Sequence, residues 1–408
     1  MSSTLRDIAP IDPAAAHPGL GLDDYQTVEL LAAGLARMYL DRQHSRQSLG
    51  PEDRVGTSGA LPRAWRTAVT RLWWTGLAQQ VNWPGDDLDV FAACRRPLGT
   101  WPIRLDLAEG DRDQVLLEGD ELSEFAEQSV ALAGCQDVEA ELVENRVFAL
   151  LMAAAQANGS TQQEIQDAYV TLRLLLVHQP VLSDLDVIKR VWAMPAAAPQ
   201  GEPYVKDLVR AAYRFQPAPG TVTLRVCDSC GNPLTSPLVR CPVASCPGRA
   251  GTRTVRTLEG YWVQNRATRR FHHDAGLVED RLFKGSDALA AQLVEDGCPI
   301  RVSLERYPLM DTWDGSLHFT HGDGSAECWL FDAKDTVSAT LLGRCFSPPS
   351  EPEAARRFLV LAQHRATPAY RADLERELHG RVRGITVMDE TTFLRQAAQH
   401  ARRLGGRA

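Results

Sequence analysis

Hydrophobic residues recur at steps of three and four through much of the first half of the chain. The pattern is clear in residues 30–40, 142–151 and 165–176. Because a helix has 3.6 residues per turn, such steps place the apolar side chains on one face. The pattern therefore predicts a mostly α-helical region from Asp23 onward. The first 20 or so residues, rich in Pro, Ala and Gly, predict a loose arm.

Three tryptophans in this region, Trp65, Trp73 and Trp74, lie at roughly helical spacing. Large aromatic side chains usually bury much of their area in cores and interfaces. We interpret these three as core or interface residues rather than as platforms on which bases stack.

Residues 194–203 lack any periodicity and contain three prolines, so they are the best candidate for a linker. One short helix is expected after it, through Tyr213. Beyond this point the hydrophobic pattern changes. It predicts a helix from Gly276 to a stop at Gly297, three strands in a meander, and then a strand, a helix and a strand. The meander strands are expected at 300–304, at 316–320 and in a segment that ends at 334. The later strands are expected at 356–364 and 384–388, with a helix at 370–378 between them.

The composition is ordinary for a globular protein, with 44% hydrophobic and 24% charged residues among 408. No apolar run reaches the roughly 18 residues that a membrane span needs. The first ten residues show no basic segment followed by an apolar one, so no signal peptide is expected. These features favour a cytoplasmic protein.

The net charge of −8 is unevenly distributed. Residues 221–408 carry 25 Lys and Arg against 22 Asp and Glu, which leaves the negative excess in residues 1–220. The C-terminal half is therefore the better candidate for binding a polyanion.

Four of the nine cysteines are closely spaced. Cys227 and Cys230 are separated by two residues and followed by a glycine, and Cys241 and Cys246 are separated by four. Two such pairs can supply the four thiolates of a tetrahedral zinc site. Because all four ligands would be protein groups, the zinc would fold the module rather than catalyse a reaction. The spacing predicts a zinc ribbon over residues 221–256.

The third strand of the meander ends in Asp332-Ala-Lys334. Residues two apart on a strand point to the same face, and Asp314 at the mouth of the preceding strand can converge there. Carboxylates are the ligands that Mg²⁺ or Mn²⁺ prefers, and Lys334 can orient a water or offset phosphate charge. The tripeptide alone is a weak signal. Its position at the end of a buried strand, after a helix with an acid near its start, favours hydrolysis of nucleic acid.

These segments resemble a known family. The zinc ribbon, the segments 269–279 and 311–317, and Phe331-Asp-Ala-Lys-Asp335 are similar to restriction-endonuclease-fold proteins associated with prokaryotic PIWI-RE systems, which belong to the PD-(D/E)XK nucleases. The resemblance implies that Asp314, Asp332 and Lys334 form the metal and catalytic set, with Glu279 as the helix acid that completes it. It also implies a role in defence against invading DNA, together with a PIWI-like protein and a helicase.

The sequence departs from the family pattern at one point. No proline directly precedes Asp314, so Asp311, three residues after Pro308, is a rival for the first carboxylate. Upstream, Arg269, Arg270 and His273 are candidates for contacts to DNA phosphates, with a solvated basic turn as the alternative.

The expected fold is α + α/β. A helical N-terminal domain (1–194) is followed by a linker with a short helix (195–220), the zinc ribbon (221–256) and a restriction-endonuclease-like α/β/α core (257–408). The expected function is that of a metal-dependent endonuclease acting on DNA. One alternative is a catalytically silent DNA-binding or scaffold subunit of the same kind of complex. Another is a zinc-dependent regulator that reads DNA, although no helix-turn-helix pattern is found.

Overall fold

The structure, a computed structural model, describes residues 23–47, 61–119, 121–132, 138–193, 202–234, 238–349 and 355–406. The chain divides into two compact units. The first comprises Met1–Asp137 and Val337–Cys345, and the second comprises Val138–Thr336 and Phe346–Ala408. The chain passes between the units after residues 137, 336 and 345, and none of these boundaries coincides with the predicted division after residue 194. The expected loose arm and most of the expected linker lie outside the described residues.

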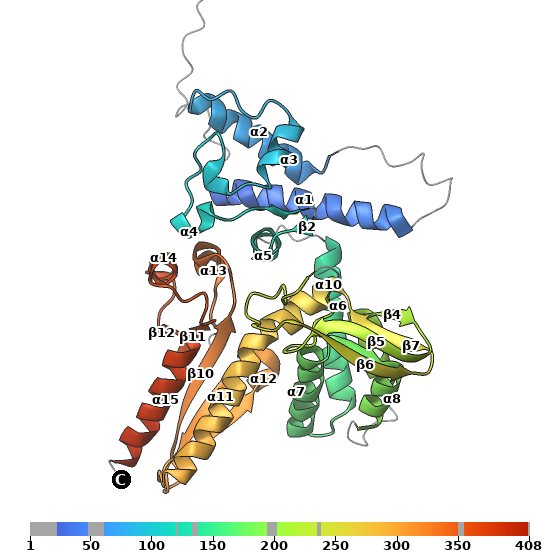
Figure 1. Cartoon of the computed structure of the whole chain (residues 1–408). Helices are drawn as coiled ribbons and strands as arrows, with labels where there is room; N and C mark the ends of the chain where they lie inside the picture. The colour runs from blue at the N-terminus through green and yellow to red at the C-terminus, as the bar shows by residue number, and fades with distance from the viewer. Residues whose placement is uncertain are drawn as a thin grey trace, which may run out of the picture. The chain divides into compact units, whose positions relative to one another are not determined.

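The first unit is mainly helical, as the hydrophobic periodicity predicts (Figure 1). Its elements are α1 (Asp24–Gln47), α2 (Arg63–Ala78), α3 (Asp87–Ala93), the short 3-10 helix η2 (Leu98–Thr100), α4 (Glu109–Arg112), the strands β1 (Leu117–Glu118) and β2 (Glu121–Leu122), α5 (Glu124–Leu132) and α13 (Ala339–Cys345). Val28 and Leu31 of α1 and Leu72 of α2 are fully buried in its core. Burial of these apolar faces is what stabilises the helices.

The three tryptophans do not share one environment. Trp65 is fully buried in the core of the first unit. Trp73 and Trp74 are 43% and 46% exposed and contact each other edge to face, with ring centroids 5.0 Å apart. A core position is therefore confirmed for Trp65. Trp73 and Trp74 lie outside the core, because their side of α2 faces away from it, and for these two the interface role stays a prediction.

One buried carboxylate ties distant parts of the first unit together. Asp111 is 4% exposed and accepts hydrogen bonds from the hydroxyls of Tyr25 (2.6 Å) and Ser338 (2.7 Å). Next to Ser338, helix α13 contributes Leu341 to the same hydrophobic core as α1 and α2. The segment 337–345 is thus part of the N-terminal unit although it follows strand β10 in the chain.

The second unit begins with a helical layer. Its helices are α6 (Val138–Ala157), α7 (Gln162–His178), α8 (Asp184–Ala193) and α9 (Glu202–Ala212). Helix α9 confirms the short helix predicted after the linker. Thr161 caps α7 through a capping box with Glu164, in which each side chain accepts from a main-chain N–H of the other residue.

Two small antiparallel sheets follow this layer. One has the strand order β3-β7-β4 and consists of β3 (Val181–Ser183), β7 (Gly260–Gln264) and β4 (Tyr213–Pro217). The other is a hairpin of β5 (Gly220–Cys227) and β6 (Ala250–Thr257). The end of β5 and the loop between β5 and β6 carry the closely spaced cysteines, at the position where the sequence predicts a zinc ribbon.

The largest sheet has five strands in the order β12-β11-β10-β9-β8. The strands β8, β9 and β10 form an antiparallel meander, and β10, β11 and β12 run parallel. Their bounds are β8 (Arg301–Arg306), β9 (Gly315–Thr320), β10 (Ala326–Lys334), β11 (Arg356–Leu361) and β12 (Ile385–Asp389). The meander and both later strands are confirmed.

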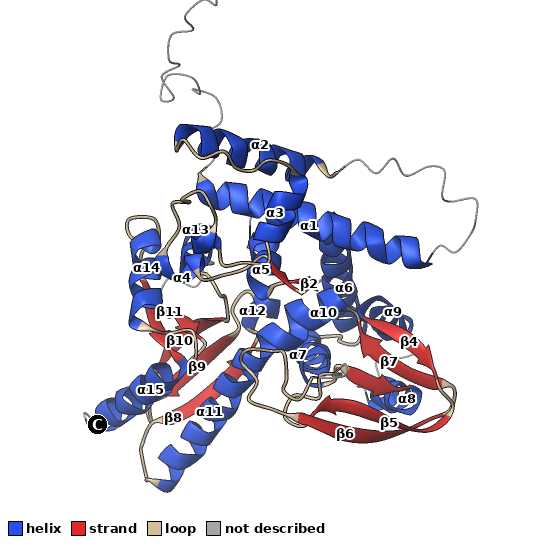
Figure 2. Cartoon of the chain, turned by 45° about the horizontal axis from the view of Figure 1, so that its top comes forward, coloured by secondary structure: helices blue, strands red, loops and turns tan. Residues whose placement is uncertain are grey.

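Helices α11 (Ala275–Glu295) and α15 (Glu390–Gly405) cover the same face of this sheet (Figure 2). The ring of Phe331 on β10 lies 6.3 Å from that of Phe283 on α11 and 5.1 Å from that of Phe393 on α15. Helix α14 (Pro368–Leu378) connects β11 to β12. The described part of the chain contains no helix long and apolar enough to cross a membrane.

Candidate functional site

The site is built where strand β10 extends beyond its neighbour β9. Pairing between these strands ends at Phe331 and Gly315, so the last residues of β10 run beside β11 only. The Oδ2 atom of Asp314, just before β9, accepts the main-chain N–H of Ala333 at 2.5 Å. A side chain thus satisfies a donor that has no strand partner on that side, and Asp314 is fixed next to Asp332.

The glycine after Asp314 is required by packing. A Cβ atom at Gly315 would lie 2.3 Å from the ring of Phe331. Because Phe331 is fully buried under α11 and α15, its ring has no room to move away. The sequence Asp314-Gly315 therefore brings the two strands close enough for the carboxylate to reach Ala333.

Asp332 and Lys334 point to one face of β10, as their spacing predicts. Lys334 Nζ lies 2.5 Å from Asp332 Oδ1. The side chains are 16% (Asp332) and 36% (Lys334) exposed, so both are partly accessible to solvent. Burial lowers the pKa of Lys334, but the carboxylates of Asp332 and Asp314 outweigh it and raise the pKa overall. Lys334 is therefore a cation at neutral pH.

Asp314 lies among other carboxylates and is 9% exposed. Burial raises the pKa of Asp314 well above its usual range, and the nearby charges of Glu279 and Asp332 raise it further. Lys334 only partly offsets these effects. A cluster of acids with raised pKa values is the electrostatic setting that a divalent cation relieves.

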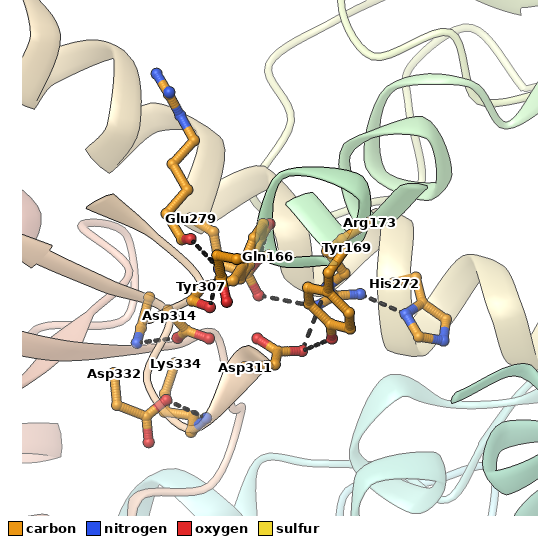
Figure 3. Close-up of polar contacts among 12 residues, drawn as sticks. Gln166, Tyr169, Arg173, His272, Glu279, Tyr307, Asp311, Asp314, Asp332 and Lys334 are labelled. Atoms are coloured by element: carbon orange, nitrogen blue, oxygen red, sulfur yellow. Dashed lines mark hydrogen bonds and ion pairs between the residues drawn. The ribbon is translucent and has the colours of Figure 1, made fainter. Parts of the chain in front are cut away.

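Glu279, near the start of α11, is held by both of its oxygens. Oε2 accepts the hydroxyl of Tyr307 at 2.6 Å, and Oε1 lies 3.2 Å from Nη2 of Arg173 on α7. The glutamate is 4% exposed. Burial raises the pKa of Glu279, with Arg173 opposing the rise. Figure 3 shows Glu279 and Asp314 on either side of Tyr307.

Asp311, the rival first carboxylate, is turned toward α7 instead of β10. Its Oδ2 accepts the hydroxyl of Tyr169 at 2.9 Å and lies 3.6 Å from Nε of Arg173 (Figure 3). Asp314 alone of the two bonds to the main chain of the Asp332-Ala-Lys334 tripeptide. The geometry therefore favours Asp314 as the first carboxylate.

The loop between β8 and β9 has an unusual backbone. Tyr307, Leu309, Met310 and Asp311 all have positive φ angles, between 50° and 73°. Tyr307 directly precedes the short turn α12 (Pro308–Asp311), and Leu309 and Met310 within this turn are left-handed. Residues other than glycine adopt this region at an energetic cost, and clusters of them are found mainly at functional sites.

The predicted phosphate contacts lie on a π-helical segment, η3 (Arg269–Asp274), directly before α11. His273 is fully buried, and its Nδ1 lies 2.5 Å from the carbonyl oxygen of Val177, which argues against a contact to DNA. Burial lowers the pKa of His273 to about 4, so it is neutral. Arg269 lies 3.8 Å from Asp274, and Arg270 lies over the Phe271 ring; both are half-buried.

The four predicted cysteines come together at one point. Their sulfur atoms all lie within 4.8 Å of one another, with 3.6 Å between Cys227 and Cys246 and 3.7 Å between Cys230 and Cys241. A tetrahedral site with Zn–S bonds of about 2.3 Å requires sulfur separations of about 3.8 Å. None of them forms a disulfide. The donor set and its spacing fit a structural zinc ion.

Two glycines shape the loops that hold these sulfur atoms. Gly231 has φ +76° and donates its N–H to the carbonyl of Cys227 at 3.0 Å, so it closes the turn after the first pair. At Gly248, a Cβ atom would lie 2.3 Å from Sγ of Cys227. The glycine predicted to release the backbone after the first cysteine pair therefore has a direct structural reason, and Gly248, two residues after Cys246, has another.

An arginine links the cysteine loop to the largest sheet. Arg281 on α11 donates to both carboxylate oxygens of Glu390 at 2.9 Å, and its Nη1 donates to the carbonyl of Ser245 at 3.2 Å. Ser245 directly precedes Cys246. Glu390, at the start of α15, also accepts the main-chain N–H of Gln363. The cysteine loop, α11 and α15 are thus joined through one guanidinium group.

The acids differ from the cysteines in one respect. Among the residues that the structure describes, only the four cysteines form a group of three or more potential ligands within 4.8 Å. Asp314, Asp332 and Glu279 are close enough to shift the pKa of Asp314, but their oxygens are not gathered around one point. Their oxygen donors suit Mg²⁺ or Mn²⁺ in kind.

Arg173, Tyr169, Gln166 and Tyr307 were not predicted from the sequence as parts of this site. Arg173 did carry a signal, because it interrupts the apolar run from Leu172 to Val177 in the middle of a helix. A charge in such a run is usually buried with a partner of opposite sign. The identity of that partner, Glu279, cannot be predicted from the local pattern, because it lies more than 100 residues away in the chain.

Two family models match separate parts of the chain. Residues 276–405 match the family model described as "REase associating with pPIWI_RE". Residues 53–183 match the model described as "pPIWI_RE three-gene island domain Y". No curated protein and no solved structure gives a significant match. The resemblance inferred from the sequence is confirmed, and the domain Y match adds an assignment for a region predicted only to be helical.

Proposed function

Because the chain carries a REase-type domain associated with pPIWI-RE systems, we propose that it is a divalent-metal-dependent endonuclease that hydrolyses DNA. The observation that carries the proposal is the placement of Asp314 beside Asp332 and Lys334 at the open end of β10. The helix α11 followed by the meander β8-β9-β10 and the parallel strand β11 supports a restriction-endonuclease core.

The proposed roles follow from position. Asp314 and Asp332 would hold Mg²⁺ or Mn²⁺, with Glu279 as the buried acid behind them. The bound metal would polarise the phosphodiester and lower the pKa of a water molecule. Lys334, a partly exposed cation beside Asp332, would orient the attacking water or stabilise negative charge on the phosphate. Asp314 and Glu279 must lose their protons to take part, so binding of the metal and ionisation of these acids are coupled.

For the cysteine cluster, the proposed ligand is one structural zinc ion. Four thiolates leave no position for a water or substrate, so the role of zinc would be to fix the β5–β6 loop. Through Arg281, that loop contacts the helix that carries Glu279. Zinc binding would therefore support the geometry of the acid cluster without taking part in the chemistry.

The proposed partners are DNA, a PIWI-like protein and a helicase, in a system that defends a prokaryotic cell. Support for the protein partners comes only from the two family matches, since both families are described by their link to pPIWI-RE. The balanced charge of residues 221–408, compared with the acidic residues 1–220, supports contact between DNA and the C-terminal half.

Cleavage of labelled double- and single-stranded DNA in Mg²⁺ or Mn²⁺ tests the proposal. The variants Asp332→Asn and Lys334→Ala should each lower the rate at least about 100-fold, the usual effect of removing a group that stabilises the transition state. Asp323→Asn, an exposed acid in the β9–β10 turn, is the control and should cut like the wild type. Equal cleavage by all four proteins would refute the assigned site.

A catalytically silent subunit is the alternative. It predicts no cleavage by the purified wild type in either metal, and none after addition of the PIWI-like protein and the helicase. Cleavage that appears only with those partners, and that Asp332→Asn abolishes, would instead show an enzyme that depends on its complex.

A further inference from the structure

Helix α7 lies within the segment that matches domain Y, whereas Glu279, Tyr307 and Asp314 lie within the segment that matches the REase-type family. Both groups belong to the same compact unit. The side chains of Gln166, Tyr169 and Arg173 project from one face of α7, at steps of three and four residues, toward the candidate site (Figure 3).

Each of the three contacts the left-handed turn that precedes Asp314. Gln166 donates through Nε2 to the carbonyls of Arg306 (3.1 Å) and Tyr307 (2.7 Å), and its Oε1 accepts the N–H of Met310 at 3.2 Å. A single amide thus satisfies three main-chain groups of the turn. Tyr169 adds its hydroxyl bond to Asp311 at 2.9 Å.

Arg173 is the centre of this group. It is 5% exposed and is shared between two carboxylates, Glu279 at 3.2 Å and Asp311 at 3.6 Å. Its guanidinium carbon lies 5.4 Å from the centre of the Tyr307 ring, and Nη1 contacts Nδ1 of the buried His272. A buried guanidinium with two acidic partners fixes both of them, because moving either one would leave a buried charge without a partner.

Tyr307 transmits this support to the acids of the site. Its main-chain N–H donates to the carbonyl of Asp314 at 2.9 Å, and its hydroxyl donates to Glu279 at 2.6 Å. The ring packs edge to face against Phe283 of α11, with centroids 5.3 Å apart. A shift of the turn would therefore move Asp314 and release Glu279 together.

We infer that α7 completes the nuclease site from the domain Y segment, with Arg173, Gln166 and Tyr169 as positioning residues for Glu279 and Asp314. The inference rests on the proposed function, because it assigns these residues to the metal site of that enzyme. The contacts of these three residues are to the turn and to the acids, and none of the three is proposed as a metal ligand. The positive φ angles at Tyr307 and Leu309 to Asp311 make such support necessary, since a strained turn persists only where its surroundings hold it.

Binding of Mn²⁺ to the full-length, zinc-loaded chain, followed by electron paramagnetic resonance of the free ion, tests the inference. Asp332→Asn identifies the site, because it should abolish binding. Gln166→Met and Arg173→Met should each raise the dissociation constant for Mn²⁺ at least about 10-fold, as expected for groups that orient metal ligands. Gln163→Met, on the exposed face of the same helix, should bind like the wild type.

Thermal melting of each variant without Mn²⁺ shows whether the variant still folds. A variant that folds but binds Mn²⁺ more weakly has lost the positioning of the ligands and not the fold. Arg173→Met leaves a buried carboxylate unpaired, so it is the variant most at risk of not folding. In that case Gln166→Met and Tyr169→Phe, which remove only hydrogen bonds, decide the question. A folded Gln166→Met protein with unchanged Mn²⁺ affinity, together with an unchanged Tyr169→Phe, would overturn the inference and leave the proposed function intact. A wild type with no Asp332-dependent Mn²⁺ binding would overturn both.

Discussion

Oδ2 of Asp314 lies 2.5 Å from the main-chain nitrogen of Ala333, so the carboxylate before β9 binds the end of β10 on the side that has no strand partner. This contact favours Asp314 over Asp311 as the acid that belongs with Asp332 and Lys334. Asp311, only three residues earlier, turns to α7 instead. The first prediction compares these two residues directly.

Asp314→Asn should abolish DNA cleavage almost completely, by at least about 100-fold, because it removes a proposed ligand of the metal. Asp311→Asn should reduce cleavage less, because its carboxylate faces Tyr169 and Arg173. Single-turnover cleavage with each variant at saturating Mn²⁺ measures the difference. The reverse order, with Asp311→Asn the more damaging, would identify Asp311 as the first carboxylate.

Asp314 should also make the metal-free protein less stable at neutral pH. Burial raises the folded-state pKa of Asp314 well above its ordinary value. Between the unfolded and folded pKa values the folded protein binds more protons than the unfolded chain, so the stability from this group falls as pH rises through that window. Above the folded-state pKa, the ionised and buried carboxylate of Asp314 destabilises the folded protein by its full amount at every pH.

Asp314→Asn should therefore raise the melting temperature of the metal-free protein at neutral pH by a few degrees. The gain should shrink as pH falls through the folded pKa of Asp314, where the wild-type side chain becomes neutral as well. Mg²⁺ should stabilise the wild type and have little effect on the variant. Melting curves across pH, with and without Mg²⁺, measure both effects; a variant that melts lower at neutral pH would contradict the account.

The cysteine cluster predicts about one zinc ion per chain by elemental analysis. Cys227→Ser should lower the zinc content and the melting temperature, because the ion and the fold of the β5–β6 loop depend on each other. Cys298→Ser is a matched control, since Cys298 lies outside the cluster and its Sγ contacts the carbonyl of Ala401 instead. A stably folded wild type without zinc would refute the assignment.

Gly248→Ala should weaken zinc binding although it removes no ligand. The added methyl group would lie 2.3 Å from Sγ of Cys227, so the sulfur or the loop must move. Zinc release to a chromogenic chelator should be faster than from the wild type. Gly110→Ala is the control, because a Cβ atom there meets nothing within 4 Å; equal release rates in all three proteins would show that the loop has more room than the structure indicates.

Arg281→Met should destabilise the protein by about 1 kcal/mol, since it removes charge-assisted hydrogen bonds to Glu390 and the bond to Ser245. Lys284→Met, one turn further along α11, removes only an exposed ion pair with Asp280 and should change stability little. Urea denaturation of both variants gives the comparison, and zinc content should be unchanged in Lys284→Met. An Arg281 variant as stable as the Lys284 variant would show that the link is energetically unimportant.

The sequence by itself determined the local features of this protein. Hydrophobic periodicity predicted the helical first half and the order of α11 and the meander, because each depends on residues close together in the chain. Spacing also predicted the four-cysteine cluster, since each pair lies within one turn. Asp332 and Lys334 were placed on one face by strand alternation alone.

Only the tertiary structure decided the features that depend on distant residues. The geometry that favours Asp314 over Asp311 depends on the end of β10 and on helix α7. The pairing of Arg173 with Glu279 joins positions 106 residues apart. Helix α13 belongs to the first unit although Val138–Thr336, a segment of the second unit, separates it from the rest of the first unit in the chain. No local pattern records such contacts, because they form only when burial and charge pairing are satisfied by the whole fold at once.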